Sequence, residues 1–265
     1  FRSFKNLIRL QVLNLEDNCL FKIEKGLFDF NHQLNNLNLA KNLLKTIKSY
    51  NLNRLYSLKS LNLSFNSLTD IENESFFDLE NLEELKLNFN KFSNLKSHFF
   101  SRLSNLKILE LSSNLIELID ENYFWNNSNL EILYLDNNNI KHLHELSFSR
   151  LLKINSINLN NNQIIMLNKE FINLTNLEKL YLSNNPLASL SNIGNIIKEL
   201  DLSQTKINFE NFSLMNDLTY LLDLDLSNNK MNRKILQNLN ITRSKKLKRL
   251  ILIGIGLKSN DSIKF

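Results

Sequence analysis

Aliphatic positions recur along this chain in a fixed frame, Leu-x-x-Leu-x-Leu-x-x-Asn, and a further Leu, Ile or Phe usually follows two positions after the asparagine. The asparagine recurs every 24 residues, and once after 23, at Asn18, Asn42, Asn66, Asn90, Asn114, Asn138, Asn162 and Asn185. A fixed period of roughly 20 to 50 residues predicts a solenoid of stacked coils. Because side chains alternate along a strand, the Leu-x-Leu pair predicts a short strand with both leucines facing the core. Paired strands lie about 4.8 Å apart while the opposite side is thicker, so we expect an arc with a concave parallel sheet.

The asparagine of the frame lies where each coil leaves its strand and where backbone groups lose their sheet partners. A side-chain amide offers two donors and one acceptor, so stacked asparagines predict a ladder that bonds the backbone of two neighbouring coils. Asn229 continues this series, but Thr205 takes the ladder position 20 residues after Asn185 and Ile255 takes the last one. We therefore expect one solenoid over residues 1–265, with about eleven repeats, truncated at both ends, and irregular at about 191–216.

A second register supports the solenoid. A bulky apolar residue follows each ladder asparagine after ten positions, at Phe28, Leu52, Phe76, Phe100, Phe124, Phe148 and Ile172. Aliphatic residues also follow each asparagine after five positions, from Ile23 to Leu190. We expect the first set to stack as a spine on the far side of the core. In the last of these coils, Phe171 lies beside the expected Ile172.

The outward positions of the frame form the candidate binding surface. Phe65 and Phe89 directly precede ladder asparagines in adjacent coils, so we expect their rings side by side on a face that is otherwise polar. Exposed aromatic residues next to charges are typical of interface hot spots. The alternative is that both rings fold against neighbours at the strand edge. The predicted ligand-binding residues on the concave face are Phe65, Phe89, Lys86, Glu110, Tyr134, Asp136 and Tyr181.

Composition adds little chemistry. The net charge is +5, and residues 233–265 hold nine Lys and Arg against one Asp. A nucleic-acid contact through residues 233–249 is the alternative to a solvated flank, and we expect the flank. No catalytic arrangement, phosphate-binding loop or cofactor motif stands out, and we expect neither an enzyme nor a cofactor. His142 and His144 lack a third ligand, so no metal site is expected. Cys19 is the one cysteine and is interpreted as a small filler residue.

Seven Asn-x-Ser/Thr sequences are candidate sites of N-glycosylation. They begin at Asn62, Asn73, Asn126, Asn173, Asn211, Asn240 and Asn260. This number is close to the number expected by chance in a chain so rich in asparagine, so the sequences are candidates and do not by themselves place the chain outside the cell.

The frame, its length of 24 residues and the phenylalanine register together resemble the "typical" leucine-rich repeat class of animal extracellular proteins. The chain is similar over about residues 4–257 to the ectodomains of Toll and Toll-like receptors. The resemblance implies a leucine-rich-repeat horseshoe, an α/β solenoid with a concave parallel β-sheet and a mostly irregular convex side. It also implies a non-catalytic domain that binds a protein or glycan ligand on its concave face, often as a homo- or heterodimer.

Within this resemblance, a cell-surface receptor of innate immunity or a secreted recognition protein is expected. Its extracellular location, signal segment and membrane anchor would depend on sequence absent from this chain, because no apolar run of about 20 residues is present. The alternative is an intracellular scaffold or regulatory subunit that uses the same surface. Intracellular repeats are typically shorter and lack the phenylalanine register, which favours the extracellular interpretation.

Overall fold

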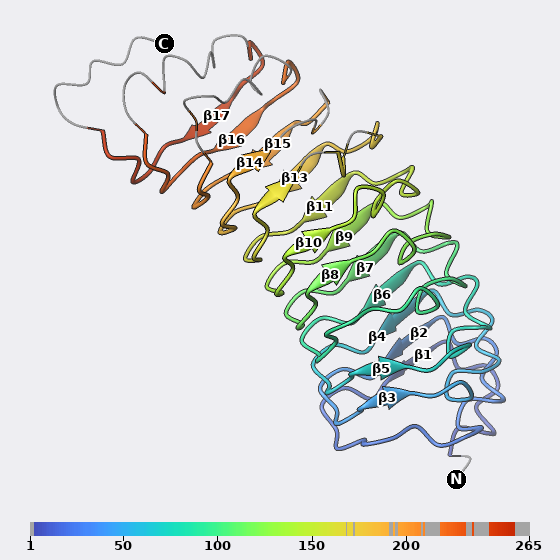
Figure 1. Cartoon of the computed structure of the whole chain (residues 1–265). Helices are drawn as coiled ribbons and strands as arrows, with labels where there is room; N and C mark the ends of the chain where they lie inside the picture. Colours follow the sequence, from blue (N-terminus) through green and yellow to red (C-terminus); the bar gives the residue numbers. More distant parts are fainter. Residues whose placement is uncertain are drawn as a thin grey trace.

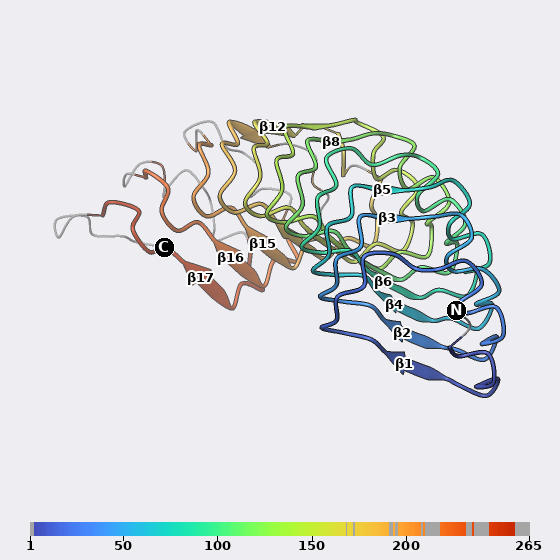
Figure 2. The same ribbon diagram turned by 90° about the horizontal axis from the view of Figure 1, so that it is seen from below.

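The computed structural model describes residues 3–167, 169–171, 173–190, 193, 196–207, 209, 218–231, 235 and 244–257. The chain coils into a curved solenoid, and one parallel sheet of 11 strands follows its inner side (Figures 1 and 2). In chain order the strands of this sheet are β1 (Val12–Asn14), β2 (Asn36–Asn38), β4 (Ser60–Asn62), β6 (Glu84–Lys86), β7 (Ile108–Glu110), β9 (Ile132–Tyr134), β11 (Ser156–Asn158), β13 (Lys179–Tyr181), β15 (Glu199–Asp201), β16 (Asp223–Asp225) and β17 (Arg249–Ile251).

Short two-stranded ladders lie on the outer side of the arc (Figure 2). They are β3 (Thr46–Ile47) with β5 (Asp70–Ile71), β8 (Leu118–Ile119) with β10 (His142–Leu143), and β12 (Met166–Leu167) with β14 (Ser189–Leu190). Otherwise the described outer segments are turns and bends with almost no helix. The predicted concave parallel sheet and mostly irregular convex side are confirmed. No helical segment among the described residues has the length and apolar character needed to cross a bilayer.

Each inner strand is three residues long because one inward leucine or isoleucine is flanked by two outward residues. Leu61 and Leu85, for example, pair in register and are 0% exposed, while the residues on either side of them are half-buried. Burying an apolar side chain of this size stabilises the folded chain by about 1.5–3 kcal/mol. Repetition of this pattern from coil to coil produces one continuous core along the arc.

The ladder asparagines bond the backbone of two coils at once. Asn66 Nδ2 donates to the carbonyls of Leu63 and Ser64 in its own coil (3.1 and 3.2 Å) and of Leu39 in the preceding coil (3.0 Å). Its Oδ1 accepts from Leu44 N at 3.0 Å. The same two-coil pattern recurs at Asn42, Asn90, Asn114, Asn138, Asn162 and Asn185. Asn18, in the first described coil, bonds only carbonyls of its own coil among the described residues.

The ladder changes its chemistry at Thr205 and Ile255 without losing every bond. Thr205 Oγ1 donates to Leu202 O and contacts Asn229 Oδ1, both at 3.1 Å, while Asn229 Nδ2 donates to the same Leu202 O at 2.8 Å. At the last position the backbone O of Ile255 accepts from Met231 N at 3.2 Å. Sheet pairing also continues through β15, within the section expected to be irregular. Much of that section, 191–192, 194–195, 208 and 210–216, lies outside the described residues.

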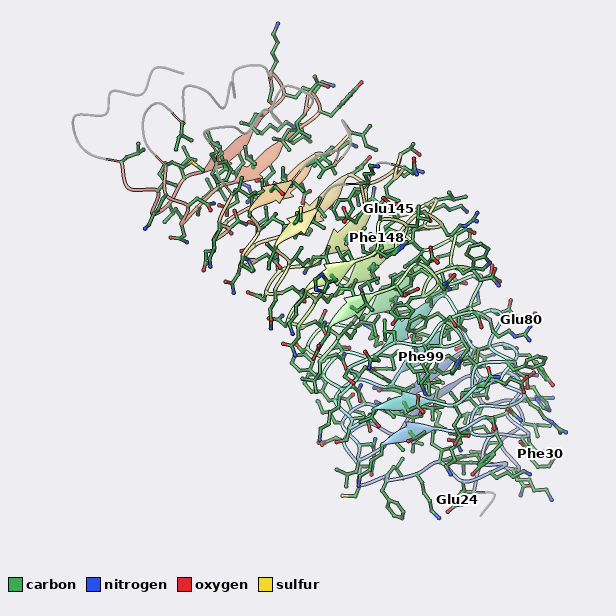
Figure 3. All side chains as sticks on the ribbon, in the orientation of Figure 1. Glu24, Phe30, Glu80, Phe99, Glu145 and Phe148 are labelled. Carbon is green, nitrogen blue, oxygen red and sulfur yellow. The ribbon has the colours of Figure 1, made fainter. Side chains whose placement is uncertain are left out.

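A stack of phenylalanine rings forms the opposite wall of the core. Phe100, Phe124 and Phe148 stack with centroids 6.1 and 6.3 Å apart, and Phe4 stacks on Phe28 at 6.1 Å. Figure 3 shows Phe99 and Phe148 inside the solenoid and Glu80 and Glu145 on its outside. Phe171 continues the stack, with its ring centroid 5.8 Å from that of Phe148. Because that coil is one residue shorter, Phe171 occupies the position predicted for Ile172, which lies outside the described residues.

Candidate functional site

The inner sheet presents two outward rows of side chains, because each three-residue strand has one outward residue on either side of its buried centre. Strict register carries both rows across every strand of the sheet. The first row includes Ser60, Glu84, Ile108, Ile132, Ser156 and Lys179, and the second includes Asn62, Lys86, Glu110, Tyr134, Asn158 and Tyr181. The predicted concave-face residues lie on β6, β7, β9 and β13 or on the turns that follow β4, β6 and β9.

Phe65 and Phe89 stack on each other where the chain turns off β4 and β6. Their rings are nearly parallel, with centroids 4.2 Å apart and an interplanar angle of 11°, yet the residues remain 44% and 47% exposed. Both have positive φ, 52° and 54°. A bulky side chain in this left-handed region is strained by about 1–2 kcal/mol. The two rings therefore stay exposed, and the backbone of both residues is strained. The folded chain keeps this exposed apolar surface at a cost in stability.

Lys86 lies at the centre of an ion cluster on neighbouring strands. Its Nζ is 3.1 Å from carboxylate oxygens of both Glu84 and Glu110. Burial lowers the pKa of Lys86, but hydrogen bonds and charge attraction from the two carboxylates outweigh burial, so its pKa is raised. Ser60 Oγ donates to Glu84 at 2.8 Å, and this hydrogen bond holds the Glu84 carboxylate in place. Lys86 and Glu110, both predicted from the sequence, are therefore brought together and hold each other in fixed positions.

An apolar pair in the middle of the sheet was missed in the sequence analysis. Ile108 and Ile132 pair in register, face outward and are half-buried beside Glu110 and Tyr134. Side chains directly opposite on paired strands have Cβ atoms about 5 Å apart, so the two isoleucines form one apolar strip. The signal was present in the frame, because both residues occupy the outward position just before the first strand leucine, where the other coils have polar residues except for Val12 in β1.

Tyr181 and Asp136 are held by separate local networks. Tyr181 Oη donates to Glu199 Oε2 at 2.6 Å, and Lys179 Nζ lies 2.8 Å from the other oxygen of Glu199. Burial and this carboxylate raise the pKa of Tyr181, so the phenol stays neutral as a donor. Ser112 Oγ donates to Asp136 Oδ1, and Asn137 Nδ2 donates to its Oδ2, both at 2.6 Å. The predicted residues thus share one face but form several small groups along it.

The far part of the concave face is acidic. Asp201 and Asp225 pair in register on β15 and β16, with Asp223 and Glu199 in the adjacent row. Burial raises the pKa of Asp201, and the charges of Asp225 and Asp223 add to this effect, although the N–H and hydroxyl of Ser203 partly oppose it. Arg249 pairs with Asp223 and is the nearby cation on β17. An anionic ligand would therefore meet repulsion on this part of the sheet.

The candidate glycosylation sites differ in accessibility. Asn73, Asn126 and Asn173 are exposed on the outer side of their coils, whereas Asn62 is half-buried in β4 and accepts from Ser64 N and Oγ (3.0 and 2.7 Å). Asn211, Asn240 and Asn260 lie outside the described residues.

The structure places the histidine pair and the described basic residues of 233–249, Lys245 and Lys248 among them, on the surface. In the part of the chain that the structure describes, no three His, Cys, Asp or Glu residues are placed to hold a metal ion. His142 and His144 are both exposed. Of the basic residues in 233–249, Lys246 lies over the Tyr220 ring at 4.2 Å and Arg249 pairs with Asp223, while 233–234 and 243 lie outside the described residues.

Comparisons with known proteins agree with this geometry. The sequence pattern described as leucine rich repeat matches residues 32–92, 80–140 and 128–187, together more than half of the chain. The TLR13 structure solved as a TLR13–ssRNA13 complex is 30% identical with a TM-score of 0.85, over 95% of this chain and 38% of that one. The Drosophila Toll–Spatzle complex (23% identity, TM-score 0.71, 87% of this chain and 36% of that one) and its glycosylated form (23%, 0.73, 86% and 36%) share the fold. No curated protein matches the chain by sequence.

Proposed function

The chain belongs to the leucine-rich repeat family, and from this premise we propose that it is a non-catalytic recognition domain of a Toll-like receptor or of a secreted binding protein. It takes a protein or glycan ligand on its concave sheet. The similarity to TLR13 over most of the chain supports the receptor type, although the chain spans only 38% of the TLR13 chain. An intracellular scaffold remains the second interpretation, and no observation on this chain favours it.

The observation that carries the proposal is the exposed, strained stack of Phe65 and Phe89. Natural sequences place Asn, Asp or Gly in the left-handed region because those residues tolerate it, and this register otherwise contains mostly such small or polar residues. Two adjacent phenylalanines at this position lower stability and also expose apolar area. Such residues are expected where binding compensates for the lost stability. The neighbouring ion cluster of Lys86 and the strip of Ile108 and Ile132 supply charge and further apolar contact on the adjoining strands.

A protein ligand fits this surface better than RNA. The TLR13 structure contains a single-stranded RNA, but that ligand belongs to TLR13. On the described concave face of this chain the acids outnumber the cations. The acids are Glu16, Asp17, Glu84, Glu110, Asp136, Glu199, Asp201, Asp223 and Asp225, and the cations are Lys41, Lys86, Lys179 and Arg249. Binding of nucleic acid requires cations that replace the counterions of the phosphates.

The location is tested on the endogenous full-length protein. Its gel mobility is compared before and after enzymatic removal of N-glycans, and faster migration after treatment is expected for a protein of the secretory pathway. Unchanged mobility, with seven candidate sequences available in this chain alone, would transfer support to the intracellular scaffold.

The binding surface is tested by changing Phe65 to Asp and Phe89 to Asn together, because Phe65→Asn would create an Asn-x-Ser glycosylation sequence with Asn66 and Ser67. Asn and Asp tolerate positive φ, so we expect the melting temperature to stay the same or rise. Loss of two hot-spot rings costs binding about 2 kcal/mol or more, a loss of roughly 30-fold or more in affinity. The immobilised chain is used to capture proteins from extracellular fluid of the source organism. The affinity of each protein that the wild type retains is then measured for the wild type and for the double variant.

The matched control is Gln204→Asn, which changes an exposed residue of the same register with a φ of 53°. Retention that is equal for the double variant and for this control would remove the phenylalanine pair from the binding surface.

A further inference from the structure

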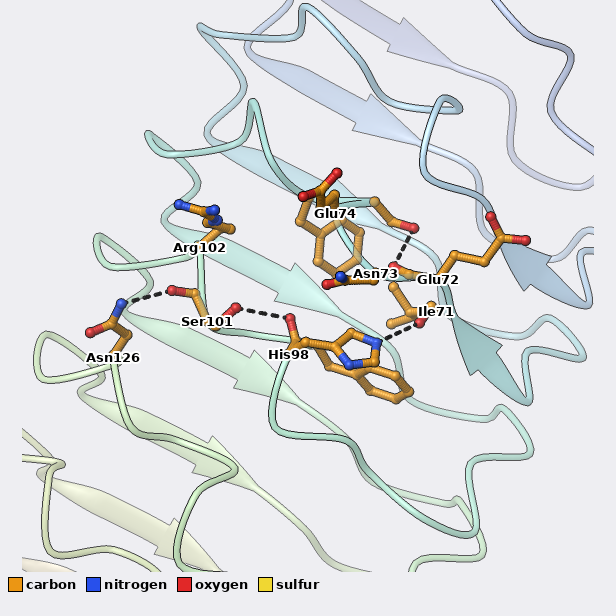
Figure 4. Close-up of a pocket in the computed structure, with 11 residues that line it drawn as sticks. Ile71, Glu72, Asn73, Glu74, His98, Ser101, Arg102 and Asn126 are labelled. Carbon is orange, nitrogen blue, oxygen red and sulfur yellow. Dashed lines mark hydrogen bonds between the residues drawn. The ribbon is translucent and has the colours of Figure 1, made fainter.

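On the outer side of the arc, three adjoining hollows follow one another across the coils between residues 71 and 150. The first, of about 260 Å³, is lined by Asn73, Arg102 and Asn126 among others (Figure 4). It shares His98 and Ser101 with a second hollow of about 450 Å³, which in turn shares Asn122 and Trp125 with a third of about 330 Å³. Neighbouring hollows share lining residues, and we refer to the three together as the outer groove; none of the residues that line them lies on a strand of the concave sheet.

Trp125 stands in this outer groove and is the one tryptophan of the chain. The residue is 56% exposed and lines both the second and the third hollow. The guanidinium of Arg150 lies 4.2 Å from its ring centroid and occupies one side of the indole. The corresponding positions one coil before and after hold Ser101 and Ser149. A large exposed indole between two coils that hold serine at the same position marks a site where something covers apolar surface.

Asn126, next to this indole, begins the sequence Asn126-Asn127-Ser128, which fits the requirement for N-glycosylation. Asn126 and Ser128 are both exposed. Asn126 Nδ2 donates to Ser101 O at 2.9 Å, so the amide is directed across the wall of the outer groove (Figure 4). Nδ2 is the atom that a glycan would modify, and a modified amide keeps one N–H, so this hydrogen bond can persist beside the sugar.

We propose that Asn126 carries an N-linked glycan whose first sugar residues lie in the outer groove against Trp125. In the transfer, a bond forms between Nδ2 and the sugar C1, the bond from C1 to the phosphate oxygen of a lipid-pyrophosphate oligosaccharide breaks, Nδ2 loses one proton, and the lipid pyrophosphate leaves. The C–H face of a pyranose is apolar and packs on an indole, while its hydroxyls find hydrogen-bonding partners such as Ser97, His98 and Asn122. The proposal rests on the extracellular location proposed above.

The other accessible candidates lack this combination. Asn73 and Asn126 both line the first hollow, but Asn126 directly follows Trp125 in the chain, whereas Asn73 lies two coils earlier. Asn173 lies in a later coil, where residues 168 and 172 are outside the described residues. Asn62 is half-buried in the concave sheet, with Oδ1 bonded to Ser64. Asn126 is therefore the described candidate that directly follows an exposed aromatic residue, and Asn73 is the natural control.

The test uses the 265-residue chain secreted behind a cleavable signal peptide from an animal cell line. Glycopeptide mass spectrometry measures occupancy at each asparagine, and intrinsic fluorescence reports on Trp125 alone. Ser128→Ala removes the glycosylation sequence but leaves Asn126, its hydrogen bond and Trp125 in place. Because the indole is about half exposed without a glycan, we expect quenching by acrylamide to be roughly twofold weaker in the wild type than in Ser128→Ala. Asn73→Gln is expected to match the wild type.

Each result decides a different claim. Glycan at Asn126 with weaker quenching in the wild type supports the proposal. Glycan at Asn73 or Asn173 but none at Asn126 overturns the proposal and leaves the extracellular location standing. Glycan at Asn126 with equal quenching in wild type and Ser128→Ala means that the sugar projects into solvent, which overturns the packing. Absence of glycan from every candidate overturns this proposal, whereas the proposed location is decided separately by the gel mobility of the endogenous protein.

Discussion

At the scale of single residues, two neighbouring positions in each coil have opposite demands. The ladder position needs an amide, because a buried turn has carbonyls to satisfy on two coils, as at Asn66. The position before it needs a residue that tolerates positive φ, as Asn137 and Asn161 do. The last coil has Gly254 there, with a φ of 68° and Asn228 Oδ1 only 2.4 Å from where a Cβ would lie. Phe65 and Phe89 violate this local preference, which is why they identify the candidate surface.

Replacing a central ladder residue, Asn66→Asp, is expected to destabilise the chain by about 3 kcal/mol or more. Aspartate lacks the Nδ2 donor, so three carbonyls lose a partner and a buried carboxylate faces their oxygens. Urea denaturation followed by circular dichroism gives the free energy of unfolding. Asn18→Asp is the matched control: Asn18 is exposed and bonds two carbonyls, so a much smaller loss is expected. Equal losses in both variants would mean that the amide ladder contributes no more in the core than at its end.

Asp201→Asn is expected to stabilise the chain near pH 7. Burial, with the charges of Asp225 and Asp223, raises the pKa of Asp201. An acid whose folded pKa is raised destabilises the fold above that pKa, and this penalty disappears as the pH falls below the ordinary aspartate pKa. Asn keeps the local turn, because Asn158 Oδ1 accepts the same type of bond at 3.1 Å that Asp201 accepts at 2.9 Å. The measurement is the difference in melting temperature from pH 7 to pH 3.5. A constant difference would contradict the prediction.

At the scale of the coil, the core has two walls with different tolerances. The strand wall is set by register, since one leucine per strand pairs with the next. The phenylalanine wall is set by which ring can reach the stack. In the coil that is one residue shorter, Phe171 stacks on Phe148 in place of Ile172, the residue predicted from the 24-residue spacing. The outer corner is also less uniform. Asn31 and Asn127 are buried where neighbouring coils have Leu55, Leu79 and Leu103, and each leaves its Oδ1 without a hydrogen-bond partner among the described residues.

Phe124→Ala, in the middle of the stack, is expected to lower the free energy of unfolding by about 3–5 kcal/mol. The change leaves a cavity between two rings, and the surrounding coils relax only partly to fill it. Phe124 is 1% exposed and lies between Phe100 and Phe148. Coils of a solenoid contact mainly their neighbours, so the unfolding transition is also expected to broaden or divide. Phe77→Ala, at a residue that is 47% exposed, serves as the control. A loss of stability at Phe124 no larger than at Phe77 would argue against a packed spine.

At the scale of the whole molecule, curvature and charge decide which partners fit. The strands of the inner sheet follow one another along the arc (Figure 2), and their register places two rows of outward side chains on it, so a ligand meets residues from many coils at once. The positive net charge of the chain does not describe this face, because the acids of β15 and β16 and the Lys86 cluster set its local field. The outer groove lies on the opposite side, so a glycan at Asn126 would leave the concave face open.

A single-stranded oligoribonucleotide is therefore expected not to bind the concave face at about 0.15 M salt, because carboxylates face the phosphates there. Fluorescence anisotropy with a labelled oligonucleotide is the measurement, at low and physiological salt. Binding that persists at 0.15 M salt, falls steeply as salt is raised further and is lost in Lys86→Ala would contradict our assignment of a protein ligand. A salt-sensitive signal retained in that variant would instead indicate the basic residues of 233–249.

The sequence by itself determined the period, the parallel sheet, the positions of the ladder and spine, and the pairing of Phe65 with Phe89, because each is a property of a repeating frame. A period fixes which residues of neighbouring coils are stacked, without knowledge of any distance. Tertiary structure decided what the frame leaves open. It determined that the rings of Phe65 and Phe89 stay exposed and that Phe171 continues the spine. It also determined that Ile108 and Ile132 form an apolar strip and that Trp125, next to Asn126, lies in the outer groove. These depend on side-chain packing, backbone strain and shape on the variable sides of the coils, which no period encodes.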